Sequence, residues 1–167
     1  ARHLTLPKVG EIGQSKLKQA RVFCVGAGGL GSPALLYLAA AGVGHLTVID
    51  DDTIERSNLQ RQILHADDDV GISKAESAML RLREMNPSIS IEVYADRLTS
   101  ENAIERIRGH NIVVDGTDNI PTRYLINDVC ELLDIPWVYG SIYRFEGQVS
   151  VFNLTGGPTY RDLFPTP

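Results

Sequence analysis

The sequence predicts an α/β fold of three layers, with a mainly parallel sheet and an antiparallel portion at its C-terminal end. Short apolar runs rich in β-branched residues predict strands at residues 22–25, 46–49, 89–93 and 112–114. Helix-length amphipathic segments separate these runs, which is typical of parallel strands joined by crossover helices. After Trp137, the apolar segments 137–142 and 148–152 are too close together for a crossover and therefore predict an antiparallel pair.

Helices are expected between the strands, at about residues 32–41, 58–65, 73–85, 100–108 and 121–133. Ser73 and Glu76 have the spacing of a capping box, and Pro121 suits the first turn of a helix. The last dozen residues are rich in glycine and proline, so we expect them to form a loop.

Length and composition fit one domain that spans residues 1–167, with 43% hydrophobic and 22% charged residues. A net charge of -5 argues against a nucleic-acid or membrane surface, because such surfaces usually need a basic face. No export signal or membrane span is visible, which predicts a cytoplasmic protein. Cys24 and Cys130 offer no disulfide framework or metal spacing, and both are expected to be buried. The chain begins at Ala1 and ends on Pro-Thr-Pro, and we expect it to be a fragment truncated at its C-terminus.

A glycine turn, Gly26-Ala-Gly-Gly-Leu-Gly31, lies between the first predicted strand and the first predicted helix. Glycines let the backbone approach an anion closely, and the start of the following helix attracts negative charge. The spacing of Gly26, Gly28 and Gly31, with Asp50 at the end of the next strand, is that of a dinucleotide site. Taken alone, this pattern indicates NAD or FAD, and a tight turn without a ligand is the alternative.

The helix expected at 58–65 would place Asn58, Arg61 and His65 on one face and Leu59 and Ile63 on the buried face. Arg61 offers a planar fork for phosphate oxygens, and Asn58 offers an amide that donates and accepts. A solvated amphipathic helix is the alternative.

Two further residues bear charges that call for an explanation. Lys74 places a cation at the first turn of a predicted helix, where the helix dipole disfavours it, so either a nearby phosphate holds it or it bends into water. Asp118 follows the fourth strand, at the sheet edge where α/β proteins bind ligands, and could hold Mg2+. Alternatively, Asp118 or Asn119 only caps the next helix. Residues 67–69, three aspartates, are expected to form a solvated loop.

Five motifs occur in order: the glycine turn, Asp50-Asp-Asp52, Ser57-Asn-Leu-Gln-Arg61, Lys74 and Asp115-Gly-Thr-Asp-Asn119. With them, the chain resembles the ThiF/MoeB/HesA family of ubiquitin-activating-type adenylyltransferases, from about residue 2 to residue 163. Segments 122–128 and 140–148 look especially like the bacterial MoeB/MoeZ branch. The resemblance implies a Rossmann-like fold in which residues 1–167 are a single ATP-binding adenylation domain.

The resemblance also implies ATP and Mg2+ as ligands and the C-terminal Gly-Gly carboxylate of a small sulfur carrier of the MoaD or ThiS type as substrate. Gly28 and Gly29 would approach the phosphates and Asp50 the ribose, while Asn58, Arg61 and Lys74 would bind the polyphosphate. Asp52 and Ser57 would belong to the same nucleotide-binding set, and Asp118 would hold the metal. Arg2, in an N-terminal segment of residues 1–20, would reach the ATP of a partner subunit in a homodimer.

One departure from the family concerns zinc. Many relatives have a Cys-x-x-Cys pair where this chain has Thr159 and Asp162, so no structural zinc is predicted. The sulfur donor would be a rhodanese or a cysteine desulfurase. The carrier and pathway (molybdopterin, thiamin, cysteine or tRNA) stay open. Two alternatives from other classes are an NAD-dependent oxidoreductase and a catalytically silent nucleotide-binding module, either a pseudo-enzyme or a fragment.

Overall fold

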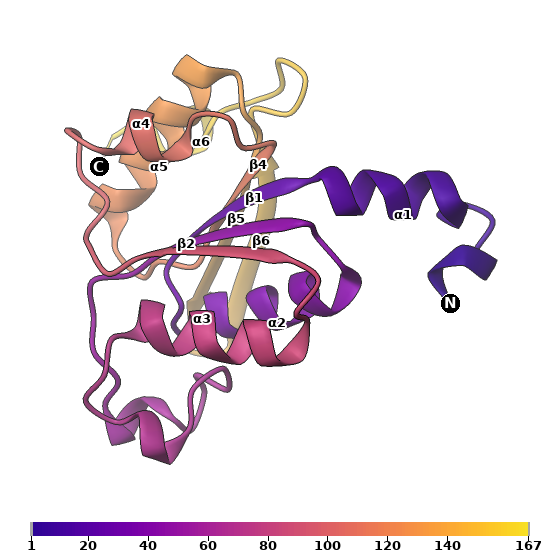
Figure 1. Ribbon diagram of the computed structural model, residues 1–167. Helices are drawn as coiled ribbons and strands as arrows, with labels where there is room; N and C mark the ends of the chain where they lie inside the picture. Colours follow the sequence, from indigo (N-terminus) through magenta and orange to yellow (C-terminus); the bar gives the residue numbers. More distant parts are fainter. Residues whose placement is uncertain (1, 167) are drawn as a thin grey trace.

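The computed structural model describes residues 2–166 and contains one six-stranded sheet in the order β3-β2-β1-β4-β5-β6 (Figure 1). The strands are β1 (Arg21–Val25), β2 (His45–Ile49), β3 (Ser90–Tyr94), β4 (Ile112–Asp115), β5 (Trp137–Tyr143) and β6 (Glu146–Phe152). Neighbouring strands from β3 to β5 are parallel, and β5 and β6 are antiparallel. The predicted α/β fold with an antiparallel C-terminal portion is therefore confirmed.

Helices cover both faces of the sheet, which gives the three predicted layers (Figure 1). They are α1 (Gly10–Gln19), α2 (Gly31–Ala41), α3 (Lys74–Met85), α4 (Ala103–Ile107), α5 (Ile120–Leu133) and α6 (Tyr160–Leu163). One buried cluster joins the sheet to α2 and α3, and a second joins the sheet to α4, α5 and α6. Cys24 lies in the first cluster and Cys130 in the second, both as free buried thiols.

Local signals place the starts of two helices where the sequence predicts them. The Ser73 hydroxyl accepts a hydrogen bond from the Glu76 N–H, which caps α3. The Asn119 side chain accepts from the Thr122 N–H at 2.9 Å, and Pro121 lies in the first turn of α5. Asn119 is therefore the cap, and Asp118 is not.

The expected helix at residues 58–65 is wrong. A short 3-10 helix, Arg56–Asn58, is followed by irregular turns, and Ile63 is 58% exposed while Leu64 and His65 are buried. Asn58 accepts a hydrogen bond from the Glu55 N–H, and His65 bonds groups outside the segment. These contacts stabilise an irregular backbone, and eight residues are too few for helix propensity to oppose them.

Smaller differences concern the ends of the chain and one crossover. The helix expected at 100–108 is shorter, and the C-terminal loop contains α6, whose Tyr160 packs against Trp137 at a ring distance of 5.8 Å. Helix α1, for which the sequence carries no clear apolar stripe, extends away from the sheet toward the N-terminus (Figure 1). Within residues 2–166, no helix has both the length and the apolar composition needed to cross a membrane.

The strand order creates the position for a site. From β1 the chain passes to β2 on one side, and β4 returns to pair with β1 on the other. The loops that leave β1 and β4 start in contact with each other and then lead to α2 and α5, which belong to different buried clusters. This arrangement leaves a crevice at the carboxyl edge, where open α/β sheets bind ligands.

Candidate functional site

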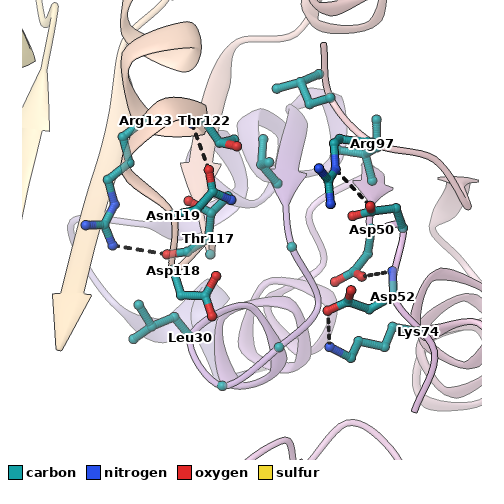
Figure 2. Close-up of a pocket in the computed structure, with 18 of the residues that line it drawn as sticks. Leu30, Asp50, Asp52, Lys74, Arg97, Thr117, Asp118, Asn119, Thr122 and Arg123 are labelled. Carbon is teal, nitrogen blue, oxygen red and sulfur yellow. Dashed lines mark hydrogen bonds and ion pairs between the residues drawn. The ribbon is translucent and has the colours of Figure 1, made fainter. Parts of the chain in front are cut away.

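A cavity of about 660 Å³ lies at this carboxyl edge. The loops after β1, β2 and β4, together with the start of α5 and the end of β5, line it (Figure 2). Among its lining residues are Gly28, Gly29, Asp50, Asp52, Arg61, Lys74 and Asp118, all of them predicted site residues.

The glycine turn forms one wall, and its glycines fall into two groups. A Cβ on Gly31 would lie 2.0 Å from the Gly26 carbonyl oxygen, and Gly26 has a φ of +94°. Both positions therefore need glycine for the turn to close. A Cβ on Gly28 or Gly29 would meet only the Gln62 or Arg61 side chain, at 3.5 and 3.6 Å. At these two glycines no side chain stands between the backbone and the cavity.

Asp50 and Asp52 form the second wall, after β2. The Asp50 carboxylate accepts hydrogen bonds from the N–H groups of Ala27, at 2.8 Å, and Asp52, at 2.9 Å. Burial raises the pKa of Asp50, whereas the two N–H groups and nearby Lys74 oppose that rise. Asp50 thus ties the glycine turn to the end of β2.

Lys74 does not bend into water. It is buried at the start of α3, and its Nζ donates to Asp52 Oδ2 at 2.7 Å (Figure 2). This ion pair stabilises the cation where the helix dipole disfavours it. The lysine is thereby held beside the cavity.

The loop after β4 forms the third wall and separates two aspartates. Asp115 is buried against Arg123, with 3.3 Å between Oδ2 and Nε, and accepts from the Thr117 N–H at 2.8 Å. Burial raises the pKa of Asp115, and these two partners oppose the shift. Asp118 is exposed, and its carboxylate extends into the cavity (Figure 2). It forms no ion pair with any residue of the described chain.

Three of the remaining predicted residues, Ser57, Asn58 and Arg2, lie outside the cavity lining. Arg61 is exposed at the cavity, but neither Ser57 nor Asn58 lines it. The Ser57 hydroxyl donates to the Glu55 carboxylate at 3.2 Å. Arg2 is exposed beside α1, next to a separate hollow that His3, Gln14 and Lys18 also line. The structure therefore does not bring Arg2 to the cavity of its own chain.

The family model of the ThiF family matches residues 1–167. The chain belongs to the ThiF family. This confirms the resemblance to the ThiF/MoeB/HesA family, and the match extends over all five motifs.

Curated relatives of this ThiF-family chain are about half identical to it. The SAMP-activating enzyme E1 of Haloferax volcanii is 54% identical over 99% of the chain and 61% of its own length. The sulfur carrier protein adenylyltransferase of Thermus thermophilus is 54% identical over 99% and 63%. The adenylyltransferase and sulfurtransferase MOCS3 of Drosophila sechellia is 52% identical over 100% and 37%. The chain thus spans less than two thirds of the length of each of these relatives.

Solved structures of E. coli MccB share the fold. A complex with a form of MccA has a TM-score of 0.80 at 28% identity and covers 89% of this chain and 44% of the other. A complex with ATP has a TM-score of 0.72 at 32% identity and covers 77% and 38%.

Two residues that line the cavity are not predicted from the sequence. Arg123 lines the cavity from α5 and donates to the Thr117 and Gly140 carbonyls as well as to Asp115. Gln62 also lines the cavity, is only 4% exposed, and its Oε1 has no hydrogen-bond partner among the described residues. A signal in the sequence could have placed Arg123 at the cavity, because Arg123 lies one turn into a helix that starts at the carboxyl edge of the sheet. Gln62 carried no signal, because the segment was interpreted as a helix.

Proposed function

We propose that the cavity binds ATP with Mg2+ and that the protein adenylates the C-terminal Gly-Gly carboxylate of a ubiquitin-like sulfur carrier. One observation carries this proposal. Asp118, a carboxylate without an ion-pair partner in the described chain, lines the same cavity as the cations Lys74 and Arg61, beside the bare backbone of the glycine turn. Oxygen ligands suit Mg2+, and cations and backbone N–H groups suit phosphates. The curated relatives, which include a sulfur carrier protein adenylyltransferase, support the same function.

The proposed reaction is attack of the carrier's terminal carboxylate oxygen on the α-phosphorus of ATP. The bond from that phosphorus to the pyrophosphate oxygen breaks, giving an acyl-adenylate and pyrophosphate. No protein nucleophile is needed, so the protein acts by alignment and charge stabilisation. The buried thiols fit this proposal, because burial raises the pKa of Cys24 and of Cys130 to about 12.

The residues divide the charge stabilisation among them. Arg61 presents an exposed guanidinium for phosphate oxygens, and Lys74 is oriented by Asp52. Asp118 would hold Mg2+, which usually takes one or two carboxylates and completes its shell with water and phosphate. When bound, the metal would neutralise charge on the phosphates. The Asp50 carboxylate would accept hydrogen bonds from the ribose hydroxyls. Contacts between the nucleotide and Ser57 or Asn58 stay predictions, because they require the loop of these two residues to approach the nucleotide.

The metal role predicts a large effect of Asp118→Ala. Carrier-dependent exchange between ATP and pyrophosphate should fall by about 30-fold to 1000-fold, because removing a preorganised charge site costs about 2–4 kcal/mol of transition-state stabilisation. Asp68→Ala, at an exposed aspartate outside the cavity, is the matched control and should exchange like the wild type. Wild-type exchange in Asp118→Ala would contradict the assignment of the metal.

Nucleotide binding separates this proposal from the other classes. Titration with ATP and with NADH should show binding of ATP alone, whereas NADH binding without ATP binding would support an oxidoreductase. A chain that binds ATP but forms no adenylate with any Gly-Gly carrier would be a silent nucleotide-binding module. Mass measurement of the adenylated carrier identifies both the product and the carrier.

The later steps are also proposals. The acyl-adenylate would accept sulfur from a rhodanese or a cysteine desulfurase and become a thiocarboxylate. We further propose a homodimer in the cytoplasm, without a nucleic-acid or membrane partner. The absence of structural zinc stays a prediction. At the two positions concerned, the Asp162 carboxylate accepts a hydrogen bond from the Thr159 N–H at 2.7 Å, in a capping box at the start of α6.

A further inference from the structure

A buried histidine lies behind the glycine turn, outside the cavity lining. His65 is only 6% exposed, and its Nε2 lies 2.9 Å from the carbonyl oxygen of Ala27, the second residue of the turn. Its Nδ1 lies 2.8 Å from the Ser77 hydroxyl on α3. His65 thus connects the glycine turn to a helix on one face of the sheet.

The chemistry of these partners assigns the imidazole protons. A carbonyl oxygen can only accept, so Nε2 must carry a proton and donate it to Ala27. The Ser32 hydroxyl donates to the same oxygen at 3.1 Å, and the Ala27 N–H donates to Asp50 at 2.8 Å. Both polar groups of the fully buried Ala27 are therefore held by side chains.

Because the peptide bond between Ala27 and Gly28 is planar and trans, the contact at the Ala27 carbonyl also orients the Gly28 N–H. The Ala27 carbonyl and the Gly28 N–H belong to one peptide unit and point in opposite directions, so a fixed carbonyl also fixes that N–H. Gly28 lines the cavity, and no Cβ covers its backbone.

We propose that His65 is a positioning residue, whose Nε2–H holds the Ala27 carbonyl and so sets the direction of the Gly28 N–H for phosphate binding. Phosphate binding by the Gly28 N–H rests on the proposed function, whereas the contact between His65 and the Ala27 carbonyl does not.

The contact persists when His65 gains a second proton. The Ser77 hydroxyl lies within hydrogen-bond distance of both His65 Nδ1 and the Asp69 carboxylate, at 2.9 Å from the latter, and has one proton to donate. With neutral His65 it donates to Nδ1, and with protonated His65 it accepts from Nδ1 and donates to Asp69. Burial lowers the pKa of His65 and Lys74 acts in the same direction, whereas the Ala27 carbonyl, Asp69 and Asp50 oppose the shift. Nε2 keeps its proton in both states.

Three variants test the role in ATP binding. His65→Leu removes the donor and should raise the ATP Kd by about tenfold, as expected for one hydrogen bond in a buried site. His65→Gln can place an amide N–H at the same carbonyl and should stay within about twofold to threefold of the wild type. His110→Leu is the control, because it removes another buried histidine, which precedes β4 at the opposite end of the strands. It should lower thermal stability without changing the Kd.

Nitrogen NMR without nucleotide tests the contact independently of ATP binding. In the wild type, the His65 ring should show a protonated Nε2 at neutral pH. Among the variants, His65→Leu should shift the Gly28 amide resonance more than His110→Leu does. An Nδ1–H tautomer, or a wild-type ATP Kd in folded His65→Leu, would overturn the proposal. If the wild type shows the Nε2–H tautomer and His65→Leu shifts the Gly28 resonance, but the wild type binds no ATP, the proposed function fails while the positioning contact stands.

Discussion

Charged side chains at the carboxyl edge are paired wherever they are buried. Buried Lys74 pairs with the exposed carboxylate of Asp52, and buried Arg123 pairs with buried Asp115, so each buried charge has an opposite charge beside it. Asp118 and Arg61 remain exposed at the cavity. The ion pairs hold Lys74 and Arg123 in place, whereas Asp118 and Arg61 stay available to a ligand.

The two buried thiols predict a loss of stability at alkaline pH. Burial raises the pKa of Cys24 and of Cys130 from the ordinary 9.0 to about 12, so the folded state keeps protons that the unfolded state releases. Their contribution is therefore complete below pH 9 and is lost as the pH rises toward 12. The free energy of unfolding should fall by about 1.4 kcal/mol per pH unit for each thiol in this window.

Urea unfolding at a series of pH values from about 8 to 11 measures this effect. Cys24→Ala lowers the overall stability because it leaves a small cavity, but its dependence on pH should be shallower than that of the wild type. Equal dependence on pH in the two proteins would show that Cys24 does not contribute.

At the scale of elements, the glycine turn and the helix that follows it form one unit. Gly26 and Gly31 approach each other through their backbones, and the Gly116 backbone after β4 packs against the same place. A Cβ on Gly116 would lie 2.9 Å from the Gly26 oxygen and 3.0 Å from the Gly31 Cα. The loops after β1 and β4 can meet here only because none of these residues has a side chain.

Gly31→Ala is predicted to be severely destabilising. Its Cβ would lie 2.0 Å from the Gly26 carbonyl oxygen, which is backbone and cannot move away cheaply. We expect a loss of roughly 3 kcal/mol in the free energy of unfolding. Gly28→Ala is the matched control, since its Cβ would make only an ordinary contact at 3.5 Å with the Gln62 side chain. Chemical denaturation of both variants should therefore show a clear difference, and equal stabilities would contradict the close approach.

At the scale of the whole molecule, the N-terminal segment is the least integrated part. Helix α1 has no buried residue, and Ile12 on it is 75% exposed. The segment extends away from the sheet, which fits the proposed role of Arg2 at a partner subunit (Figure 1). Because Arg2 would act at the site of a partner subunit, its role can be tested only in the dimer.

Mixing two inactive variants tests the trans role of Arg2. Arg2→Ala and Asp118→Ala should each lose carrier-dependent exchange, because one lacks the donated arginine and the other lacks the metal ligand. After subunit exchange, an equal mixture should recover roughly a quarter of the wild-type activity, since half of the dimers would hold one intact site. No recovery in a mixture in which native mass measurement shows mixed dimers would exclude the trans role, and so would an active monomer in sedimentation.

The sequence by itself determined the α/β alternation, the antiparallel end, the glycine turn and most of the polar residues at the carboxyl edge. These features follow from local periodicity and from motifs that occupy neighbouring positions. Only the tertiary structure decided which of these residues meet. Lys74 pairs with Asp52 across 22 positions, and His65 bonds Ala27 across 38. Such contacts depend on strand order and close packing, which local patterns do not encode. For this reason the helix predicted at 58–65 is wrong, and the sequence does not predict Arg123 and Gln62 at the cavity.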